Sequence, residues 1–372
     1  ATSTAFAVTA AAASKLVFTT GPSTVAAGSA ISPSVVVKAQ DAYGNTVTTY
    51  TSNVTISSAT TAFTGSTLTV AAVSGAATFS AVKPTTPGGA NTLTATSGAL
   101  TVTSTVFTVN AGAASKLVFT TAPAKATAGS VWLTQPVVAV QDAYGNAITS
   151  STATITLGSS GGTLSGCSAT TTGGVATFSG CRIATAGTYT QTAASTGLTS
   201  ATASLTVTPV LAPGTFSVAS GSTSSTLSTS DTMTIVFNAA VDATSLCPSW
   251  TSNTSTWTLS DVTVTGVDNT ATNDRLTISS TSCSTLGSAL GYVDLGSATF
   301  LSGALSYTAS GVSWNGSTNT MVITIGTGAS NSQSPGGVSI TYRSTTAMKD
   351  LNGVASTGGT ATFTVSGGSR AF

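Results

Sequence analysis

Electric charge is scarce in this chain of 372 residues. Lys and Arg number 10 and acidic residues 9, so only 5% of the residues are charged, against roughly 25% in a typical soluble protein. The net charge of +1 provides no basic surface of the kind that binds nucleic acid or an anionic membrane. No apolar run reaches the roughly 18 residues that a membrane span needs. We therefore expect no nucleic-acid partner and no membrane insertion.

Histidine and glutamate are absent altogether. Without His, no Ser-His-Asp or Cys-His arrangement can form. Without Glu, a glycosidase would need two Asp at a set separation, and the nine Asp are scattered with no recognisable pairing. Most of them sit beside Asn, Thr or Gly, where Asp commonly caps a turn. We expect a protein that is not an enzyme and that has no cofactor, calcium being the one candidate ligand.

Cysteine is sparse but paired. Cys167 and Cys181 flank a strand-turn-strand stretch, and Cys247 and Cys283 lie in the last third of the chain. Their even number and close spacing favour two disulfides and an oxidising, extracytoplasmic compartment, and buried free thiols are the alternative. Closing a loop of about 14 residues stabilises a fold by roughly 3 kcal/mol in the chain-entropy model. The chain starts with neither Met nor a signal peptide, so we expect a processed form or a piece of a longer chain.

Abundant Thr, Val, Ala, Ser and Gly favour short strands joined by tight turns. Internal repeats are plain: "SKLVFTT" occurs at 14–20 and 115–121, "QDAYGN" at 40–45 and 141–146, and "ATFS" at 77–80 and 176–179. The repeats predict two homologous domains of about 100 residues each. Seven strand-like segments with alternating pattern in each are typical of an immunoglobulin-like sandwich.

We predict an all-β chain of three tandem immunoglobulin-like β-sandwiches with an extra N-terminal strand. The predicted ranges are 1–12 for that strand, 13–110 and 111–211 for the two repeats, and 212–372 for a larger third domain.

The repeated motifs carry a family resemblance. "SKLVFTT…AG…VVVKAQDAYGN" and its second copy, which continues with "GTLSGCS…GGVATFSGC", resemble bacterial immunoglobulin-like repeats of the invasin/intimin type. The resemblance covers residues 13 to about 210. It implies a cell-surface location and a spacer or display role, and it implies no catalytic residue.

Residues 212–372 are similar to another bacterial immunoglobulin-like class, found in S-layer proteins. "DTMTIVFNAAVD" matches its opening strand and "AMKDLNGVASTGGTATFTV" its closing turn and strand. Asp350, Asn352 and Gly353 occupy that turn in an altered order. "GVSWNGSTNTMVITIG" predicts a hairpin with "NGSTN" at its tip.

The opening stretch "STAFAVTAAAASKLVFTT" matches the junction at 104–121 in fourteen of eighteen positions. Residues 3–9 therefore resemble the closing strand of a domain, with Thr4, Phe6 and Val8 on one face. This strand is a candidate donor that completes a neighbouring subunit by strand addition. The alternatives are that it belongs to a longer repeat array, or that it pairs with the first domain.

Two Asp-containing loops are candidate cation sites. Oxygen ligands suit calcium, and "DNTATND" places four of them in one loop: Asp268, Asn269, Asn273 and Asp274. An Asx-rich turn is the simpler interpretation. In the two "QDAYGN" stretches, Asp41 and Asp142 could ligate an ion, but we favour turn capping, with Gly44 and Gly145 at positive φ. Tyr43 and Tyr144 are then expected to pack against the sandwich edge.

Carbohydrate is a second candidate partner. Trp250 and Trp314 could stack on sugar rings if exposed, although core packing is the default for Trp. The sequons at Asn53, Asn253 and Asn315 are candidate glycosylation sites.

Uncharged strand edges favour pairing with other chains, and a net charge near zero promotes association. We expect an extracellular structural protein whose partners are copies of itself, as in a filament, sheath, pilus or S-layer-like lattice. The alternative is the stalk of an adhesin that binds host or matrix glycans, or a protein, through its last domain.

Overall fold

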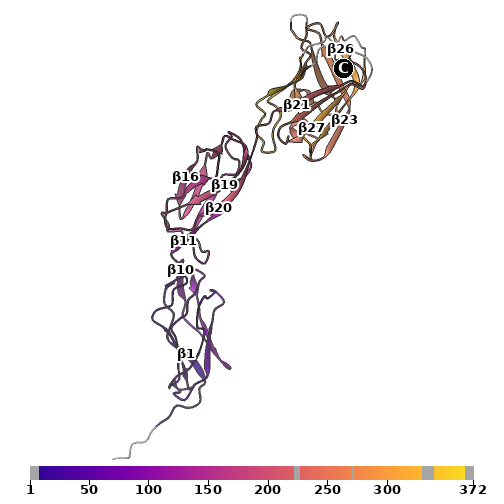
Figure 1. The fold of residues 1–372 in the computed structure, drawn as a ribbon. Helices are drawn as coiled ribbons and strands as arrows, with labels where there is room; N and C mark the ends of the chain where they lie inside the picture. Colours follow the sequence, from indigo (N-terminus) through magenta and orange to yellow (C-terminus); the bar gives the residue numbers. More distant parts are fainter. Residues whose placement is uncertain (1–7, 222–226, 270–271, 329–338, 365–372) are drawn as a thin grey trace, which may run out of the picture.

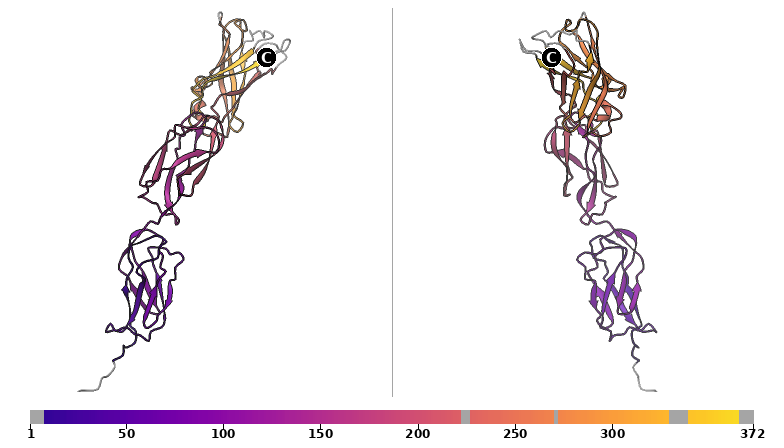
Figure 2. Two further views of the ribbon diagram at one scale, coloured as in Figure 1. Left: turned by 60° about the vertical axis from the view of Figure 1, so that its left-hand side comes forward. Right: turned by 90° about the vertical axis from the view of Figure 1, so that its right-hand side faces the viewer.

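The computed structural model describes residues 8–221, 227–269, 272–328 and 339–364. The buried side chains form three separate hydrophobic clusters, within residues 16–109, 117–207 and 211–361. We name these parts the N-terminal, middle and C-terminal units. The units follow one another in a row (Figures 1 and 2). The domain boundaries stay a prediction, and Leu211 packs in the C-terminal cluster rather than in the middle one.

The N-terminal unit contains three small sheets, with strand orders β1-β3-β6, β2-β10-β7 and β5-β4-β8-β9. Every second side chain of β3 is buried, because successive side chains of a strand point to opposite faces of its sheet. The strands are β1 (Lys15–Thr20), β2 (Val25–Ala26), β3 (Val35–Gln40), β4 (Asn53–Ser57), β5 (Thr69–Ala71), β6 (Ala76–Phe79), β7 (Gly88–Asn91), β8 (Thr94–Ser97), β9 (Leu100–Thr103) and β10 (Phe107–Asn110).

The middle unit repeats this plan in the orders β11-β13-β17-β16, β12-β20-β19-β14 and β15-β18. A disulfide joins Cys167 to Cys181 across the base of the β16–β17 hairpin. The strands are β11 (Ala114–Thr121), β12 (Ala126–Thr127), β13 (Val137–Asp142), β14 (Thr156–Ser159), β15 (Leu164–Ser165), β16 (Ser168–Thr172), β17 (Val175–Ser179), β18 (Arg182–Ile183), β19 (Gly187–Ala194) and β20 (Ala201–Thr208).

The C-terminal unit is organised differently, as one continuous sheet in the order β21-β22-β27-β26-β23-β24-β25-β29-β30, with β28 paired to β26. Strands β21 and β30 lie beside each other, so the sheet curls around its core. The elements are β21 (Pro213–Ala219), β22 (Thr232–Phe237), α1 (Ala243–Leu246), β23 (Thr256–Val267), β24 (Arg275–Ser280), α2 (Leu286–Leu290), β25 (Tyr292–Asp294), β26 (Leu305–Asn315), β27 (Thr320–Thr324), β28 (Thr327–Gly328), β29 (Ser339–Ser344) and β30 (Gly359–Thr364).

The second disulfide, Cys247–Cys283, lies in the C-terminal unit. Cys247 caps the end of α1, and Cys283 precedes α2, so the bond fastens the two short helices to each other. Both cysteines are buried within the core cluster. The predicted hairpin is also present, with Asn315 of β26 opposite Thr320 of β27.

The all-β class predicted from the sequence is confirmed. Strands make up the layers of each unit, and the helices of the described residues are one turn long. None of these helices has the length and apolar character needed to cross a bilayer. Seven strands were expected in each repeat, whereas the described parts of the N-terminal and middle units contain ten each, because strands as short as β2, β7 and β9 leave no clear alternation in the sequence.

Candidate functional site

One five-residue turn occurs in all three units, at residues 41–45, 142–146 and 350–354. In each turn the first residue is a buried Asp, and its N–H donates to the carbonyl of the fifth residue, at 2.9–3.0 Å. The Asp Oδ1 accepts the N–H groups of the third and fifth residues, at 2.9–3.0 Å. We call these the entry turns, because in space each lies at the end of its unit where the chain comes in, near residues 11, 112 and 211. In sequence the third turn comes late, between β29 and β30. Sequence reasoning favoured turn capping for Asp41 and Asp142, and these contacts are those of a cap.

The fourth position of each entry turn is Gly, with φ of +90° at Gly44, +92° at Gly145 and +76° at Gly353. Residues with a side chain rarely adopt this conformation. The third turn, with its altered letter order, therefore has the same backbone geometry as the two "QDAYGN" turns.

The second carboxylate oxygen of the first two entry turns faces the incoming chain. Ala11 N–H donates to Asp41 Oδ2 at 3.0 Å, and Gly112 N–H donates to Asp142 Oδ2 at 2.9 Å. A side-chain hydrogen bond from Asn45, aided by backbone N–H groups, lowers the pKa of Asp41. Burial raises the pKa of Asp142, but hydrogen bonds from Asn146, Gly112 and Tyr144 outweigh burial and lower it.

At the first junction, the entry turn of the middle unit contacts the far end of the N-terminal unit. Asn146 Nδ2 donates to the Thr85 carbonyl at 2.8 Å. The Tyr144 ring lies against Gly28 so closely that a Cβ there would be 2.1 Å from the Tyr144 hydroxyl. Gly28 follows β2 and donates its N–H to the Pro84 carbonyl. We call this end, formed by β2, the end of β10 and residues 84–85, the exit end.

At the second junction, the entry turn of the C-terminal unit contacts the matching exit end of the middle unit. Asn352 Nδ2 lies 3.2 Å from the Ala126 carbonyl, 2.9 Å from Thr127 Oγ1 and 3.1 Å from Thr208 Oγ1. Thr127 Oγ1 donates to Asp350 Oδ2 at 2.5 Å. Ala126 and Thr127 of β12 pair in parallel with β20, as β2 pairs with β10. The two junctions therefore join the same two surfaces.

The entry turn of the N-terminal unit has no described neighbour unit. Tyr43 is 87% exposed, whereas its counterpart Tyr144 is 44% exposed. The expectation that Tyr43 packs against the sandwich edge is wrong, because its side chain is almost entirely exposed. Tyr144 instead contacts Gly28 of the preceding unit.

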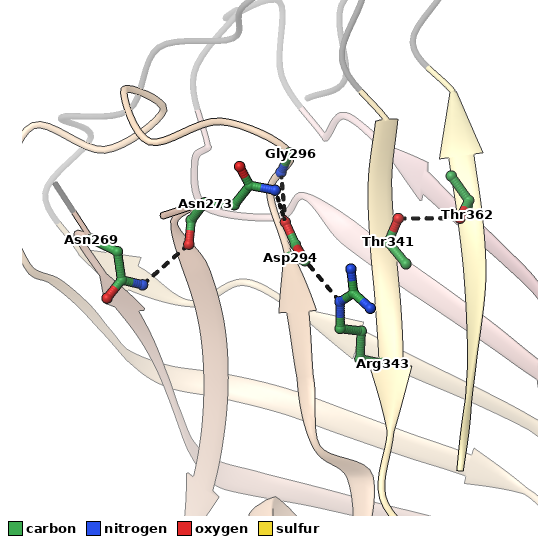
Figure 3. Close-up of polar contacts among 7 residues, drawn as sticks. All are labelled: Asn269, Asn273, Asp294, Gly296, Thr341, Arg343 and Thr362. Atoms are coloured by element: carbon green, nitrogen blue, oxygen red, sulfur yellow. Dashed lines mark hydrogen bonds and ion pairs between the residues drawn. The ribbon is translucent and has the colours of Figure 1, made fainter. Parts of the chain in front are cut away.

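The "DNTATND" loop is held by hydrogen bonds in its described part. Asp274 is fully buried, and its carboxylate accepts the N–H groups of Asn269 at 2.9 Å and Leu301 at 2.6 Å. The amide of Asn269 donates to the Asn273 carbonyl, and the amide of Asn273 donates to Asp294 at 2.9 Å (Figure 3). Among the described residues, no group of three or more acidic, Cys or His side chains could hold a metal ion. These contacts are those of an Asx-rich turn, and calcium at Asp268, Asn269, Asn273 and Asp274 stays a prediction.

Asp294 lies at the centre of this polar cluster. Besides Asn273, it accepts the Gly296 N–H at 3.0 Å, and Arg343 Nε of β29 lies 3.2 Å from its Oδ2 (Figure 3). On the same strand as Arg343, Thr341 contacts Thr362 of β30, with the two hydroxyl oxygens 3.1 Å apart (Figure 3). The Asp294–Arg343 contact is the one ion pair found in the described parts of the chain.

The two tryptophans proposed for sugar contact are core residues. Trp250 is 2% exposed and Trp314 is fully buried. Trp250 stacks on Trp257, and Trp314 makes an edge contact with Phe237. This burial agrees with core packing, the default interpretation, and contradicts the candidate sugar contact, because a ring must present a free face to stack on a sugar.

The remaining predicted residues have different surroundings. Asn53 is exposed at the start of β4, whereas Asn253 and Asn315 are half-buried and accept hydrogen bonds from Ala243 N–H and Ser317 N–H. Glycosylation at the three sequons stays a prediction. Thr4 and Phe6 of the candidate donor strand lie outside the described residues, and Val8 is 82% exposed.

Sequence reasoning missed the junction residues Asn146 and Asn352 and their partners Thr85, Thr127 and Thr208. One sequence signal could have identified the third turn: Asp and Gly occur three residues apart at 350–353, as they do in the two "QDAYGN" stretches. Which unit the turns would face was not readable from local sequence.

No protein-family model matches this sequence, and no curated protein matches it. Among solved structures, the chain is similar to FdeC, an Escherichia coli adhesin, with 15% identity and a TM-score of 0.34 over 97% of this chain and 100% of that chain. It is similar to invasin, a bacterial integrin-binding protein, with 14% identity and a TM-score of 0.28 over 94% and 79%. Domains 4 and 5 of the S-layer protein SbsC match with 19% identity and a TM-score of 0.23 over 54% and 99%. Invasin and an S-layer protein are thus among the similar structures, as the sequence motifs predicted, but likenesses at these TM-scores carry no argument about function.

The lowered pKa values of Asp41 and Asp142 predict how the entry turns respond to acid. The folded-state pKa of each lies below its ordinary value of 3.8, so the stabilisation is present above the unfolded pKa and is lost as the pH falls through the folded pKa. We expect intact turns at neutral pH and loosening in acid. Carboxyl-carbon NMR titration should give midpoints below 3.8 for both residues in the native protein. A midpoint at or above that of the urea-unfolded chain would contradict the hydrogen-bond account.

Asn352→Ala should loosen the second junction without unfolding either unit. The substitution removes the side-chain amide, whose two N–H groups are shared among three acceptors of the middle unit, each hydrogen bond being worth about 1 kcal/mol net, and it leaves Asp350 to hold the turn. We expect small-angle X-ray scattering to show a broader distribution of pair distances. Tyr43→Ala is the matched control, since it changes the same turn position where no described unit is contacted. Identical scattering from wild type and both variants would show that the Asn352 contacts do not hold the junction.

Proposed function

We propose that this chain is a non-enzymatic, extracellular structural protein of a surface assembly such as a filament, sheath or S-layer-like lattice. The observation that carries this proposal is that the same two surfaces meet at both junctions. An entry turn meets an exit end at both junctions, although the C-terminal unit has a different sheet order. A chain that brings an entry turn onto an exit end at both junctions is suited to span distance and bear load.

The chemistry of the contacts supports a role outside the cell. The junction partners are amides, hydroxyls, backbone carbonyls and the buried Asp350 carboxylate, which accepts from the Thr127 hydroxyl, and the described residues contain a single ion pair. Such contacts depend little on salt, because screening acts on charges. The two disulfides fit an oxidising compartment.

Copies of the chain are the proposed partners. Strands with few charges offer unpaired backbone groups at their edges, and the candidate donor strand at residues 3–9 adds a means of joining subunits. The alternative is an adhesin stalk whose last unit binds a carbohydrate or a protein. An end-to-end row of units fits a stalk as well, but the burial of Trp250 and Trp314 removes the feature that favoured sugar binding.

Negative-stain microscopy of the purified chain tests the assembly. We expect polymers from the full chain and none after deletion of residues 1–10, with each unit still folded because the three hydrophobic clusters lie beyond that segment. Circular dichroism checks the fold of the shortened chain. Isolated short rods under every condition would contradict assembly and favour the stalk. Polymers that persist after the deletion would rule out donation by this strand.

A further inference from the structure

Asn followed directly by Gly occurs twice in the sequence, at Asn315-Gly316 and at Asn352-Gly353. This dipeptide is prone to deamidation, because Gly has no side chain to hinder the approach of its backbone nitrogen to the carboxamide carbon of Asn. At Gly353 no atom beyond the adjoining residues lies within 4 Å of the place that a Cβ would take, whereas at Gly316 a Cβ would be 2.0 Å from the Asn253 carbonyl oxygen. The two dipeptides therefore share their sequence but differ in their surroundings.

The Asn315-Gly316 pair is fixed within the C-terminal unit. The Gly316 N–H donates to the Ser255 carbonyl at 3.2 Å, and Asn315 Oδ1 accepts the Ser317 N–H at 3.0 Å. The nitrogen and the carboxamide that would react are thus both held by contacts that break only when this part of the unit opens. This pair is an internal reference for the second one.

The side chain of Asn352 is fixed by the neighbouring unit instead. Its Nδ2 contacts oxygen atoms of the middle unit, namely Ala126 O at 3.2 Å, Thr127 Oγ1 at 2.9 Å and Thr208 Oγ1 at 3.1 Å. The described residues of its own unit make no hydrogen bond to this side chain. Separation of the two units would therefore free the carboxamide to rotate.

The turn around Gly353 also depends on the docked neighbour. The Gly353 N–H donates to the Asp350 carbonyl at 2.9 Å, and this bond occupies the nitrogen that would react. The buried Asp350 carboxylate accepts from the Thr127 hydroxyl of the middle unit, so separation of the units removes one support of the turn. Docking thus restrains both the carboxamide carbon of Asn352 and the Gly353 nitrogen.

We propose that Asn352-Gly353 is a spontaneous deamidation site that is protected while the second junction is docked and that reacts when the junction opens. The proposal rests on the proposed function, in which docked junctions align the units. The Gly353 nitrogen loses its proton to solvent hydroxide and forms a bond to Asn352 Cγ. The Cγ–Nδ2 bond breaks, and the nitrogen takes a proton from water and leaves as ammonia. Water then opens the succinimide ring at either carbonyl, which gives aspartate or isoaspartate at position 352.

The acidic product cannot restore the junction. A carboxylate has no N–H to donate to the Ala126 carbonyl, and it brings a second negative charge to Thr127 Oγ1, which the Asp350 carboxylate already contacts. Like charges in such a contact repel each other. At the first junction the docking Asn146 is followed by Ala147, whose methyl group hinders the same reaction. We therefore expect this irreversible loss of docking at the second junction and not at the first.

Peptide mass spectrometry after incubation of the full chain tests the protection by docking. The chain is prepared without glycans and kept at mildly alkaline pH, and deamidation of Asn352 and Asn315 is followed in the same samples. We expect Asn352 to react faster than Asn315, because opening a junction breaks fewer contacts than opening a unit. Thr127→Val should speed the reaction at Asn352 about fivefold, the effect of one lost hydrogen bond, and leave Asn315 unchanged. Thr208→Val, which removes another acceptor of the same amide, should act in the same direction.

Asn352→Asp, which introduces one of the two products, tests the loss of docking. We expect small-angle X-ray scattering to show a broader distribution of pair distances than in the natural chain, as for Asn352→Ala. The matched control is Asn315→Asp, which adds the same charge away from the junctions and should leave the distribution unchanged. Hydrogen exchange checks that the units of every variant are folded.

Each other outcome is decisive. Equal rates at Asn352 and Asn315 in the natural chain, or no acceleration in the folded threonine variants, would overturn protection by docking. A natural distribution of distances for Asn352→Asp, beside a broader one for Asn352→Ala, would overturn the loss of docking on deamidation alone. A natural distribution for both variants would show that Asn352 does not hold the junction, and would count against the proposed function rather than this site alone.

Discussion

A buried carboxylate sets the geometry of this protein's junctions. Asp41, Asp142 and Asp350 are each 1–2% exposed, and burying a charged oxygen is costly unless hydrogen bonds satisfy it. One oxygen of each Asp is satisfied within its own turn. The other accepts from the incoming chain at Asp41 and Asp142, and from the Thr127 hydroxyl of the preceding unit at Asp350. Because the carboxylate fixes the turn, it also fixes which side chains face the neighbouring unit.

Because charged side chains are scarce, hydroxyl and amide groups make most of the polar side-chain contacts between strands and between units. With 19 charged residues in the whole chain, cross-strand contacts are made by Thr and Ser pairs, such as Thr55 with Thr69 and Thr188 with Thr206. The junctions follow the same rule, with Asn352 between two threonines. The acid response of the entry turns is one electrostatic dependence that the structure predicts, and Asp261 adds another, because hydrogen bonds from Thr281 and Ser282 hold its pKa well below the ordinary value.

Much of the fold was readable from the sequence, because alternation and repeats are local signals. The strand "KLVFTT" is β1 at residues 15–20, and the cysteine pairs are joined as expected. The continuous sheet of the C-terminal unit was not readable, since the pairings of β22 with β27 and of β23 with β26 join segments far apart in sequence. The surroundings of Trp250 and Trp314 were equally unreadable from the sequence. Neighbouring residues in the chain do not distinguish a core tryptophan from a sugar-binding one, whereas the packing of the rings does. The docking role of Asn146 and Asn352 likewise needed the neighbouring unit to be in place.

The central claim is that entry turns hold the units in a fixed row. Residual dipolar couplings from backbone amides test it most directly, because they report the orientation of each unit relative to the others. The account predicts that couplings from the N-terminal, middle and C-terminal units of the weakly aligned full chain fit one common alignment tensor. Three different tensors, each fitting one unit alone, would contradict it.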